Sequence, residues 1–274
     1  DILELIELAN NFKSEGLIEY RHENLFPDKK VASIFCEPST RTKLSFEIAA
    51  CNLGAKFIDF NIENSSIQKG ETLEDTIEAM LLMGIDLCIL RHSDSIIHDL
   101  AKAFPEMQFI NAGEGSIAHP SQALLDLMTI QESKDAFKDL KITIVGDLDH
   151  SRVVSSFLEA IQIVGYKSIT FCGHPDLCKT FLENPVGNFE PELNIALQDA
   201  DVVIALRIQN ERLTEKLSIS ASDYVERYQI NVDSLQVASP DMILLHPGPV
   251  NFGIELNKEV SDLENCKVKN QIFN

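Results

Sequence analysis

The sequence contains no apolar run long enough to cross a membrane. Its candidates, Ile85–Leu90 and Met242–Leu245, are far shorter than the roughly 18 residues that a spanning helix needs. No charged n-region, apolar h-region or cleavage site is visible at the start. Because the chain opens on Asp1 within a predicted helix, we expect it to be a fragment without its true N-terminus. We predict no membrane association and a cytoplasmic location.

Basic side chains are also scarce. The 23 lysines and arginines are outnumbered by 43 acidic residues, which gives a formal net charge of −20. Such an acidic surface repels a phosphate backbone, so we expect no nucleic acid partner. Any local cluster of arginines is informative for the same reason, because only an anionic ligand would justify it.

Motifs for metals, dinucleotides and covalent nucleophiles are missing. There is no C-x-x-C pair, no H-E-x-x-H motif and no G-x-G-x-x-G fingerprint. The six cysteines are scattered, which indicates reduced and mostly buried thiols in a chain of this kind. We therefore predict no metal and no cofactor.

Short β-rich runs alternate with longer segments of helical spacing. This alternation predicts an α/β protein, and 274 residues suffice for two domains. We expect two doubly wound parallel-sheet domains, residues 1–133 and 134–274, with the active site in the cleft between them. Four strands are predicted in each domain: Val31–Phe35, Lys56–Phe60, Leu87–Leu90, Gln108–Ile110, Lys141–Val145, Ser168–Cys172, Val202–Leu206 and Met242–Leu245. The helical segments between them include Leu44–Asn52, Thr72–Met83, Ser121–Glu132 and Arg152–Val164.

Two long polar segments interrupt this alternation, Asn61–Gly70 and Ile208–Ser222. Loops of this length in a compact α/β protein are often functional. Ligands of open α/β sheets bind beyond the carboxyl ends of the strands, where these segments also fall. Each segment alone is equally compatible with a mobile surface loop.

The segment Ser39–Thr42 carries the strongest chemical signal. A strand ends at Cys36, Pro38 interrupts it, and Ser-Thr-Arg-Thr opens a helix. Unpaired N–H groups at a helix start, three hydroxyls and the planar fork of Arg41 suit a phosphate group. A simple helix cap needs only one hydroxyl. We therefore favour an anion site over a cap.

The surrounding run FCEPSTRTKLSFE resembles the F-x-E-P-S-T-R-T-R-x-S-F-E signature of aspartate and ornithine carbamoyltransferases. In that family the run binds the phosphate of carbamoyl phosphate. The resemblance implies this role for Ser39, Thr40, Arg41 and Thr42. Cys36 replaces a common aromatic residue and Lys43 replaces an arginine, but neither change removes a phosphate donor.

Further motifs extend the resemblance through the first half of the chain. The run QKGETLEDT is similar to the K-G-E-T loop of the aspartate enzymes, which implies that Lys69 reaches a neighbouring subunit's site. Ser66 or Ser65 would accompany it, and the spacing leaves both open. Arg91 follows a predicted strand. The run NAGEGSIAHPSQALLDL implies that His119 and Gln122 contact the carbamoyl group.

The second half resembles the part of the family that binds the amino acid. The run GDLDHSRV contains Arg152, and LRIQNERL contains Arg207 and Gln209. Two arginines from two loops suit the two carboxylates of aspartate. The run HPGP resembles a loop whose backbone carbonyls accept from the carbamoyl amine, and it places three further residues at the substrate: Pro247, Gly248 and Pro249.

The resemblance implies a transferase that converts carbamoyl phosphate and L-aspartate into N-carbamoyl-L-aspartate and phosphate, an early step of pyrimidine biosynthesis. Arg41, Thr42, Arg91 and His119 would be catalytic. A homotrimer with shared sites is implied, and separate regulatory chains remain open. The alternatives are a transcarbamylase for ornithine or another amine, and a non-catalytic binding protein of the same fold. The K-G-E-T, R-x-Q-x-E-R-L and H-P-G-P runs favour aspartate.

Overall fold

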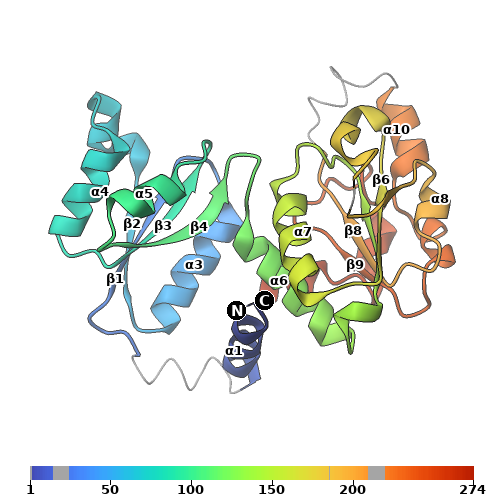
Figure 1. Ribbon diagram of the computed structural model, residues 1–274, viewed down its shortest axis with the longest axis horizontal. Coiled ribbons are helices and arrows are strands. Elements are labelled where there is room, and N and C mark those ends of the chain that lie inside the picture. The colour runs from blue at the N-terminus through green and yellow to red at the C-terminus, as the bar shows by residue number, and fades with distance from the viewer. Residues whose placement is uncertain (1, 15–24, 185, 209–219) are drawn as a thin grey trace. The chain divides into compact units, whose positions relative to one another are not determined.

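The computed structural model of the chain describes residues 2–14, 25–184, 186–208 and 220–274 (Figure 1). Its contacts define two compact units, Leu3–Ser121 (unit 1) and Gln122–Asn274 (unit 2). The change of unit falls inside helix α6 (Pro120–Ser133), whereas the sequence places the domain boundary after Ser133, and that assignment stays a prediction. Within the described residues, no helix has the length and apolarity that a membrane span requires.

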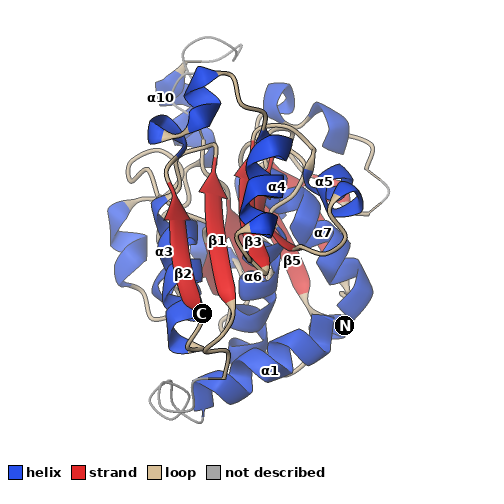
Figure 2. Ribbon diagram, turned by 90° about the vertical axis from the view of Figure 1, so that its left-hand side faces the viewer, coloured by secondary structure: helices blue, strands red, loops and turns tan. Residues whose placement is uncertain are grey.

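Unit 1 is built on a four-stranded sheet in the order β2-β1-β3-β4, in which every pair is parallel. Figure 2 shows β1, β2 and β3 as arrows that point the same way. The strands are β1 (Lys30–Phe35), β2 (Lys56–Phe60), β3 (Leu87–His92) and β4 (Gln108–Glu114). The helices are α1 (Ile2–Ser14), α3 (Thr40–Asn52), α4 (Leu73–Leu82) and α5 (Ile97–Ala103).

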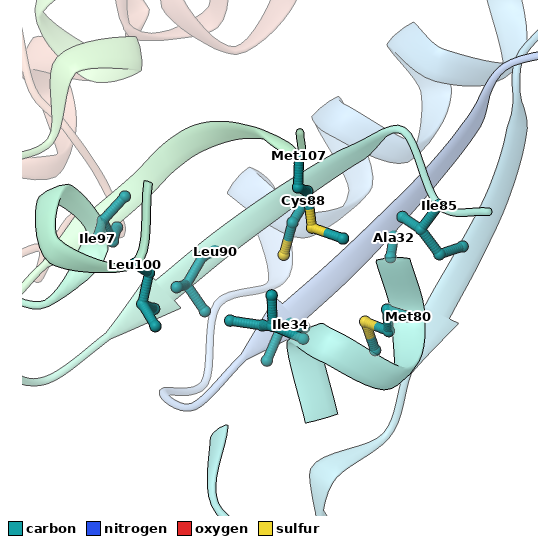
Figure 3. Packing of buried hydrophobic residues seen from close by; sticks show 10 residues of the cluster. Ala32, Ile34, Met80, Ile85, Cys88, Leu90, Ile97, Leu100 and Met107 are labelled. Carbon is teal, nitrogen blue, oxygen red and sulfur yellow. The ribbon is translucent and has the colours of Figure 1, made fainter. Parts of the chain in front are cut away.

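Alternation along the strands of unit 1 distributes apolar side chains between two cores. Ala32 and Ile34 of β1 point to one face, where they pack with Met80 of α4 (Figure 3). Val31 points to the other face and packs with Ala50 of α3. Because successive strand side chains alternate, a sheet covered on both faces needs apolar residues at consecutive positions. The run VASI satisfies this requirement and fixes the sheet between its helices.

Unit 2 is built on a five-stranded parallel sheet in the order β7-β6-β5-β8-β9. The central strands are buried along almost their whole length, which indicates that both faces are covered. The strands are β5 (Lys141–Val145), β6 (Ser168–Cys172), β7 (Asn188–Phe189), β8 (Val202–Ala205) and β9 (Ile243–Leu245). The helices that follow α6 are α7 (Arg152–Val164), α8 (Leu193–Ala196), α10 (Ala221–Tyr228) and α11 (Val268–Phe273).

The predicted fold class is confirmed, with corrections to individual elements. The second sheet has five strands among the described residues and not four, because the two-residue edge strand β7 pairs with β6. Strand β3 continues to His92, so Arg91 lies within it. The segment Asn61–Gly70 forms two short 3-10 helices, η1 (Ile62–Asn64) and η2 (Ser66–Lys69).

Two other expectations need adjustment. The predicted loop Ile208–Ser222 falls mostly outside the described residues, and α10 already begins at Ala221. The expectation of mostly buried thiols is right for only half of the cysteines. Cys36 and Cys51 are exposed and Cys266 is half-buried, whereas the buried ones are Cys88, Cys172 and Cys178.

Candidate functional site

The predicted anion site of unit 1 lies at the start of α3. Ser39 is the N-cap residue, with extended backbone angles, but among the described residues its side chain makes no capping hydrogen bond. Arg41 is exposed and Thr42 is half-buried in the first turn of the helix. The N–H groups of that turn are thus not satisfied by the Ser39 hydroxyl. This arrangement can accept an anion from solution.

Strand pairing brings Arg91 close to this turn. Phe35 of β1 is the register partner of Arg91 of β3, and the N–H of Cys36 donates to the carbonyl of Arg91 at 2.9 Å. The Arg91 guanidinium is almost buried, with 11% of the side chain exposed. Its Nε lies 3.2 Å from Oε2 of Glu37. Its Nη1 donates to the carbonyl of Ala112 at 3.3 Å.

A short turn after β4 places His119. The N–H of Glu114 donates to the carbonyl of Ala118 at 2.8 Å, which folds the chain back before α6. His119 is 8% exposed, and its Nδ1 lies 3.3 Å from Oγ of Ser121. The ends of β1, β3 and β4 therefore carry the Ser39–Thr42 turn, Arg91 and His119. In a parallel sheet these ends share one edge, where ligands of α/β proteins bind.

The candidates Ser66 and Lys69 lie in η2, after strand β2. Both side chains are exposed. Gly70 ends η2 with φ of +97°, a left-handed conformation that favours glycine. The hydroxyl of Ser65 donates to the carbonyl of Ile62 at 2.7 Å, so it already has a hydrogen-bond partner within the loop. Between the two serines that the sequence leaves open, Ser66 is the exposed one.

In unit 2, the two predicted arginines follow neighbouring strands. Arg152 is half-buried and opens α7 after β5, where Ser151 caps the helix by accepting from the N–H of Val154 at 3.4 Å. Arg207 is exposed two residues after β8. The strands β5 and β8 are paired, and the N–H of Leu206 donates to the carbonyl of Val145 at 2.8 Å. Gln209 lies outside the described residues.

The predicted loop Pro247–Pro249 follows β9 and is held by His246. The N–H of Gly248 donates to Nδ1 of His246 at 2.8 Å, so Nδ1 is an acceptor and Nε2 carries the proton. Nε2 lies 3.1 Å from Oε1 of Glu255, and both side chains are buried. Gly248 has φ of +66°, and the Gly248–Pro249 peptide bond is cis. The loop is thus fixed by a buried histidine–carboxylate pair.

Gln122 is bound to a carboxylate that the sequence analysis did not single out. Its Nε2 donates to Oδ1 of Asp126 at 2.9 Å, one turn further along α6. Asp126 is fully buried and also accepts from Nε2 of Gln271 at 2.7 Å. Burial raises the pKa of Asp126 to about 7, against the two hydrogen bonds that lower it. The spacing of four residues between Gln122 and Asp126 was the available signal, since it puts both on one helix face.

Unit 1 thus carries a helix start that can accept an anion, an arginine and a histidine at one edge of its sheet, and unit 2 carries two arginines and an ordered proline–glycine loop. The described residues contain no group of three histidine, cysteine or acidic side chains that could hold a metal ion. The candidate residues supply hydrogen-bond donors and positive charge. Such groups can bind anionic substrates and stabilise negative charge that develops during a reaction.

Two family models match the chain in succession. The aspartate/ornithine carbamoyltransferase, carbamoyl-P binding domain matches residues 1–132, and the Asp/Orn binding domain of the same family matches residues 138–274. Their junction falls at the end of α6.

Individual proteins agree with this match. The chain is 43% identical over 256 residues to the aspartate carbamoyltransferase catalytic subunit of Koribacter versatilis, covering 93% of this chain and 84% of the relative. It is 39% identical over 278 residues to the corresponding subunit of Coxiella burnetii, covering 100% and 88%. 

Solved structures show the same relationship. Aspartate transcarbamoylase from Trypanosoma cruzi in complex with carbamoyl phosphate and aspartate is similar with a TM-score of 0.86 and 28% identity, over 99% of this chain and 88% of that one. The same enzyme in complex with N-(phosphonacetyl)-L-aspartic acid gives a TM-score of 0.87. This chain belongs to the aspartate/ornithine carbamoyltransferase family.

Proposed function

We propose that this chain transfers the carbamoyl group of carbamoyl phosphate to the amine of L-aspartate, giving N-carbamoyl-L-aspartate and phosphate. The observation that carries the proposal is the Ser39–Thr42 turn, which opens α3 beside Arg91 without a side-chain cap from Ser39 among the described residues. Relatives with 39% and 43% identity bear the name of this activity.

The roles of the unit 1 residues follow from their chemistry. Ser39, Thr40, Arg41 and Thr42 bind the phosphate. Arg91, His119 and the Thr42 hydroxyl polarise the carbamoyl oxygen, on which negative charge develops during attack. A donor in such an oxyanion position contributes about 2.7–4 kcal/mol to the lowering of the barrier.

The reaction needs no covalent enzyme intermediate. The aspartate nitrogen forms a bond to the carbamoyl carbon, and the bond from that carbon to the phosphate oxygen then breaks. The departing phosphate takes the proton that the amine loses. Holding two mutually repelling anions in alignment supplies much of the remaining acceleration.

The unit 2 residues serve aspartate and the carbamoyl amine. Arg152 and Arg207 follow paired strands and each can bind one carboxylate through two hydrogen bonds. Gln209 would assist them. Gln122 and the backbone of Pro247, Gly248 and Pro249 accept hydrogen bonds from the carbamoyl amine. In this proposal the residues of both units act on the same pair of substrates.

Assembly into a homotrimer is part of the proposal, with Ser66 and Lys69 acting in a neighbouring subunit's site. Exposed apolar side chains on α3 of unit 1 support a subunit interface. Leu44 and Ile48, four residues apart on one face of α3, are 50% and 55% exposed. Such side chains are typical of subunit interfaces. We further propose a cytoplasmic enzyme of pyrimidine biosynthesis, with or without separate regulatory chains.

A coupled assay that offers aspartate and ornithine separately, each with carbamoyl phosphate, tests the proposed activity. We expect carbamoyl aspartate and phosphate in equal amounts with aspartate, and no turnover with ornithine. Turnover with ornithine alone would favour the related ornithine activity. Binding of carbamoyl phosphate without turnover of any amine would indicate a non-catalytic binding protein.

A further inference from the structure

A buried chain of hydrogen bonds in unit 2 connects two of the candidate substrate-binding elements. Gln122 Nε2 donates to Asp126 Oδ1 at 2.9 Å, and Gln271 Nε2 donates to the same oxygen at 2.7 Å. The Oε1 of Gln271 accepts from the N–H of His246 at 2.9 Å. The start of α6 and the His246–Pro249 loop are thus joined through one carboxylate oxygen and one carboxamide.

These hydrogen bonds are buried, so their donors and acceptors have little freedom to change partners. Asp126 is fully buried, and Gln271 and His246 are 4% and 1% exposed. In such surroundings a polar group that loses its partner is not compensated by water. Both ends of the Gln271 carboxamide are therefore committed, its nitrogen to Asp126 and its oxygen to His246.

The direction of the bonds has a chemical consequence at Gln122. The Asp126 Oδ1 atom accepts, so it fixes the amide nitrogen of Gln122 toward the interior. The Oε1 of Gln122 is then the atom that is presented to a ligand. A carbonyl oxygen in this orientation selects an N–H donor, such as the amine of a carbamoyl group, and disfavours a second acceptor.

The other branch orders the loop after β9. Gln271 holds the N–H of His246, His246 Nδ1 accepts from Gly248, and Glu255 Oε1 lies at His246 Nε2 and accepts from the N–H of Asn251 at 2.7 Å. The loop that carries Pro247–Pro249 is therefore linked at His246, through the Gln271 carboxamide, to the same carboxylate that orients Gln122.

From this geometry we infer that Asp126 and Gln271 are positioning residues. They hold the two proposed acceptors for the carbamoyl amine, Gln122 Oε1 and the Pro247–Pro249 backbone, in fixed positions relative to one another. The inference rests on the proposed function. Neither residue contacts the substrate; Asp126 acts through Gln122, and Gln271 acts through Asp126 and His246.

The test is a double-mutant cycle on the KM for carbamoyl phosphate. Asp126→Asn keeps the shape but offers an amide that can turn either way, so it no longer fixes Gln122. We expect a rise of about five- to tenfold in that KM, the range of one lost hydrogen bond. In a Gln122→Ala background the same substitution should change KM by no more than about twofold, because its target is already absent. 

Gln271→Met tests the second branch, since it keeps the length but removes donor and acceptor. We expect a higher KM for carbamoyl phosphate and faster hydrogen exchange at the His246 amide. Asn274→Ala is the matched control. Its Nδ2 also joins α11 to α6, through Thr129 Oγ1 at 2.9 Å and Glu132 Oε2 at 3.0 Å, but outside the chain of bonds described above. It should lower thermal stability without changing KM.

Multiplicative effects of Asp126→Asn and Gln122→Ala, or an Asn274→Ala variant whose KM rises as much as that of Gln271→Met, would overturn the inference in an active enzyme. A wild-type chain that transfers no carbamoyl group would instead overturn the proposed function, and the inference with it. The rate of carbamoyl transfer by the wild-type chain therefore distinguishes failure of the inference from failure of the proposed function.

Discussion

Glu37 and Arg91 form an ion pair at the carboxyl edge of the unit 1 sheet, with Glu37 Oε2 at 3.2 Å from Arg91 Nε. The acid belongs to the turn between β1 and α3, and the arginine belongs to β3. The pair therefore connects the proposed phosphate turn to a proposed catalytic group. A carboxylate in this place can orient the planar guanidinium of Arg91 toward this edge of the sheet.

Replacement of the acid should reveal this role. Glu37→Gln keeps the shape but removes the charge that orients Arg91. We expect kcat to fall about tenfold, equivalent to about 1.4 kcal/mol, with a smaller change in the KM for carbamoyl phosphate. Steady-state kinetics with both substrates varied provides the measurement. An unchanged kcat would mean that Arg91 is positioned without the charge of Glu37.

Arg41→Ala should abolish carbamoyl transfer without unfolding the protein. Arg41 is exposed in the first turn of α3, so its loss removes a proposed phosphate ligand and no core packing. Thermal unfolding and turnover are measured on the same sample. Arg227→Ala, which removes an exposed arginine of α10 outside the candidate set, is the control and should keep full activity. Normal turnover by the Arg41→Ala variant would show that phosphate binds elsewhere.

Arg207 should affect aspartate more than carbamoyl phosphate. We expect Arg207→Ala to raise the KM for aspartate about 10- to 100-fold, which corresponds to one hydrogen-bonded charge pair. Arg207→Lys keeps the charge but loses the planar fork, and its KM should fall between those of the wild type and the alanine variant. A rise confined to the KM for carbamoyl phosphate would contradict the assignment of the aspartate site to unit 2.

Much of this molecule could be predicted from local sequence. The strands Lys141–Val145 and Ser168–Cys172 were predicted to the residue because each is an apolar run with β-branched side chains between polar turns. Strand β7 was missed because two residues are too few for any periodicity. The extension of β3 through Arg91 was missed because charged side chains usually end a buried strand.

The candidate site could be proposed from the sequence where its residues lie in short motifs, and not where residues meet only through the fold. Ser39–Thr42 and the loop after β9 are contiguous in sequence. Gln271 and Asp126 are 145 positions apart, and no local pattern connects them. The hydrogen bond between them forms because side chains of α11 reach α6, which only the tertiary structure reveals.

A site shared between subunits predicts that two inactive variants can restore activity together. Lys69→Ala lacks the residue given to the neighbour, and Arg41→Ala lacks a residue of its own site. If the two are dissociated, mixed equally and reassembled, about one quarter of the sites in a randomly mixed ring should hold both native residues. Recovered activity near that fraction supports the shared site. Continued inactivity of the mixed, reassembled oligomer would place Lys69 in the site of its own chain.

Asp126 should also make stability depend on pH. Burial raises its pKa from 3.8 in the unfolded chain to about 7 in the folded one, and its partners Gln122 and Gln271 do not titrate. Between about pH 4 and 7 the native state thus binds a proton that the unfolded state has lost. The contribution of Asp126 to the free energy of unfolding falls as pH rises through this window, by at most about 1.4 kcal/mol per pH unit.

Asp126→Asn should therefore become progressively more stable relative to the wild type as the pH increases from about 4 to 7, because the amide carries no charge to desolvate. Urea unfolding at a series of pH values measures the difference. Parallel stability curves for the two proteins would show that Asp126 keeps an ordinary pKa in the folded state. We thus expect Asp126→Asn to gain stability at neutral pH while its KM for carbamoyl phosphate rises. That combination would show that the ionised Asp126 carboxylate costs stability and at the same time orders the substrate-binding residues.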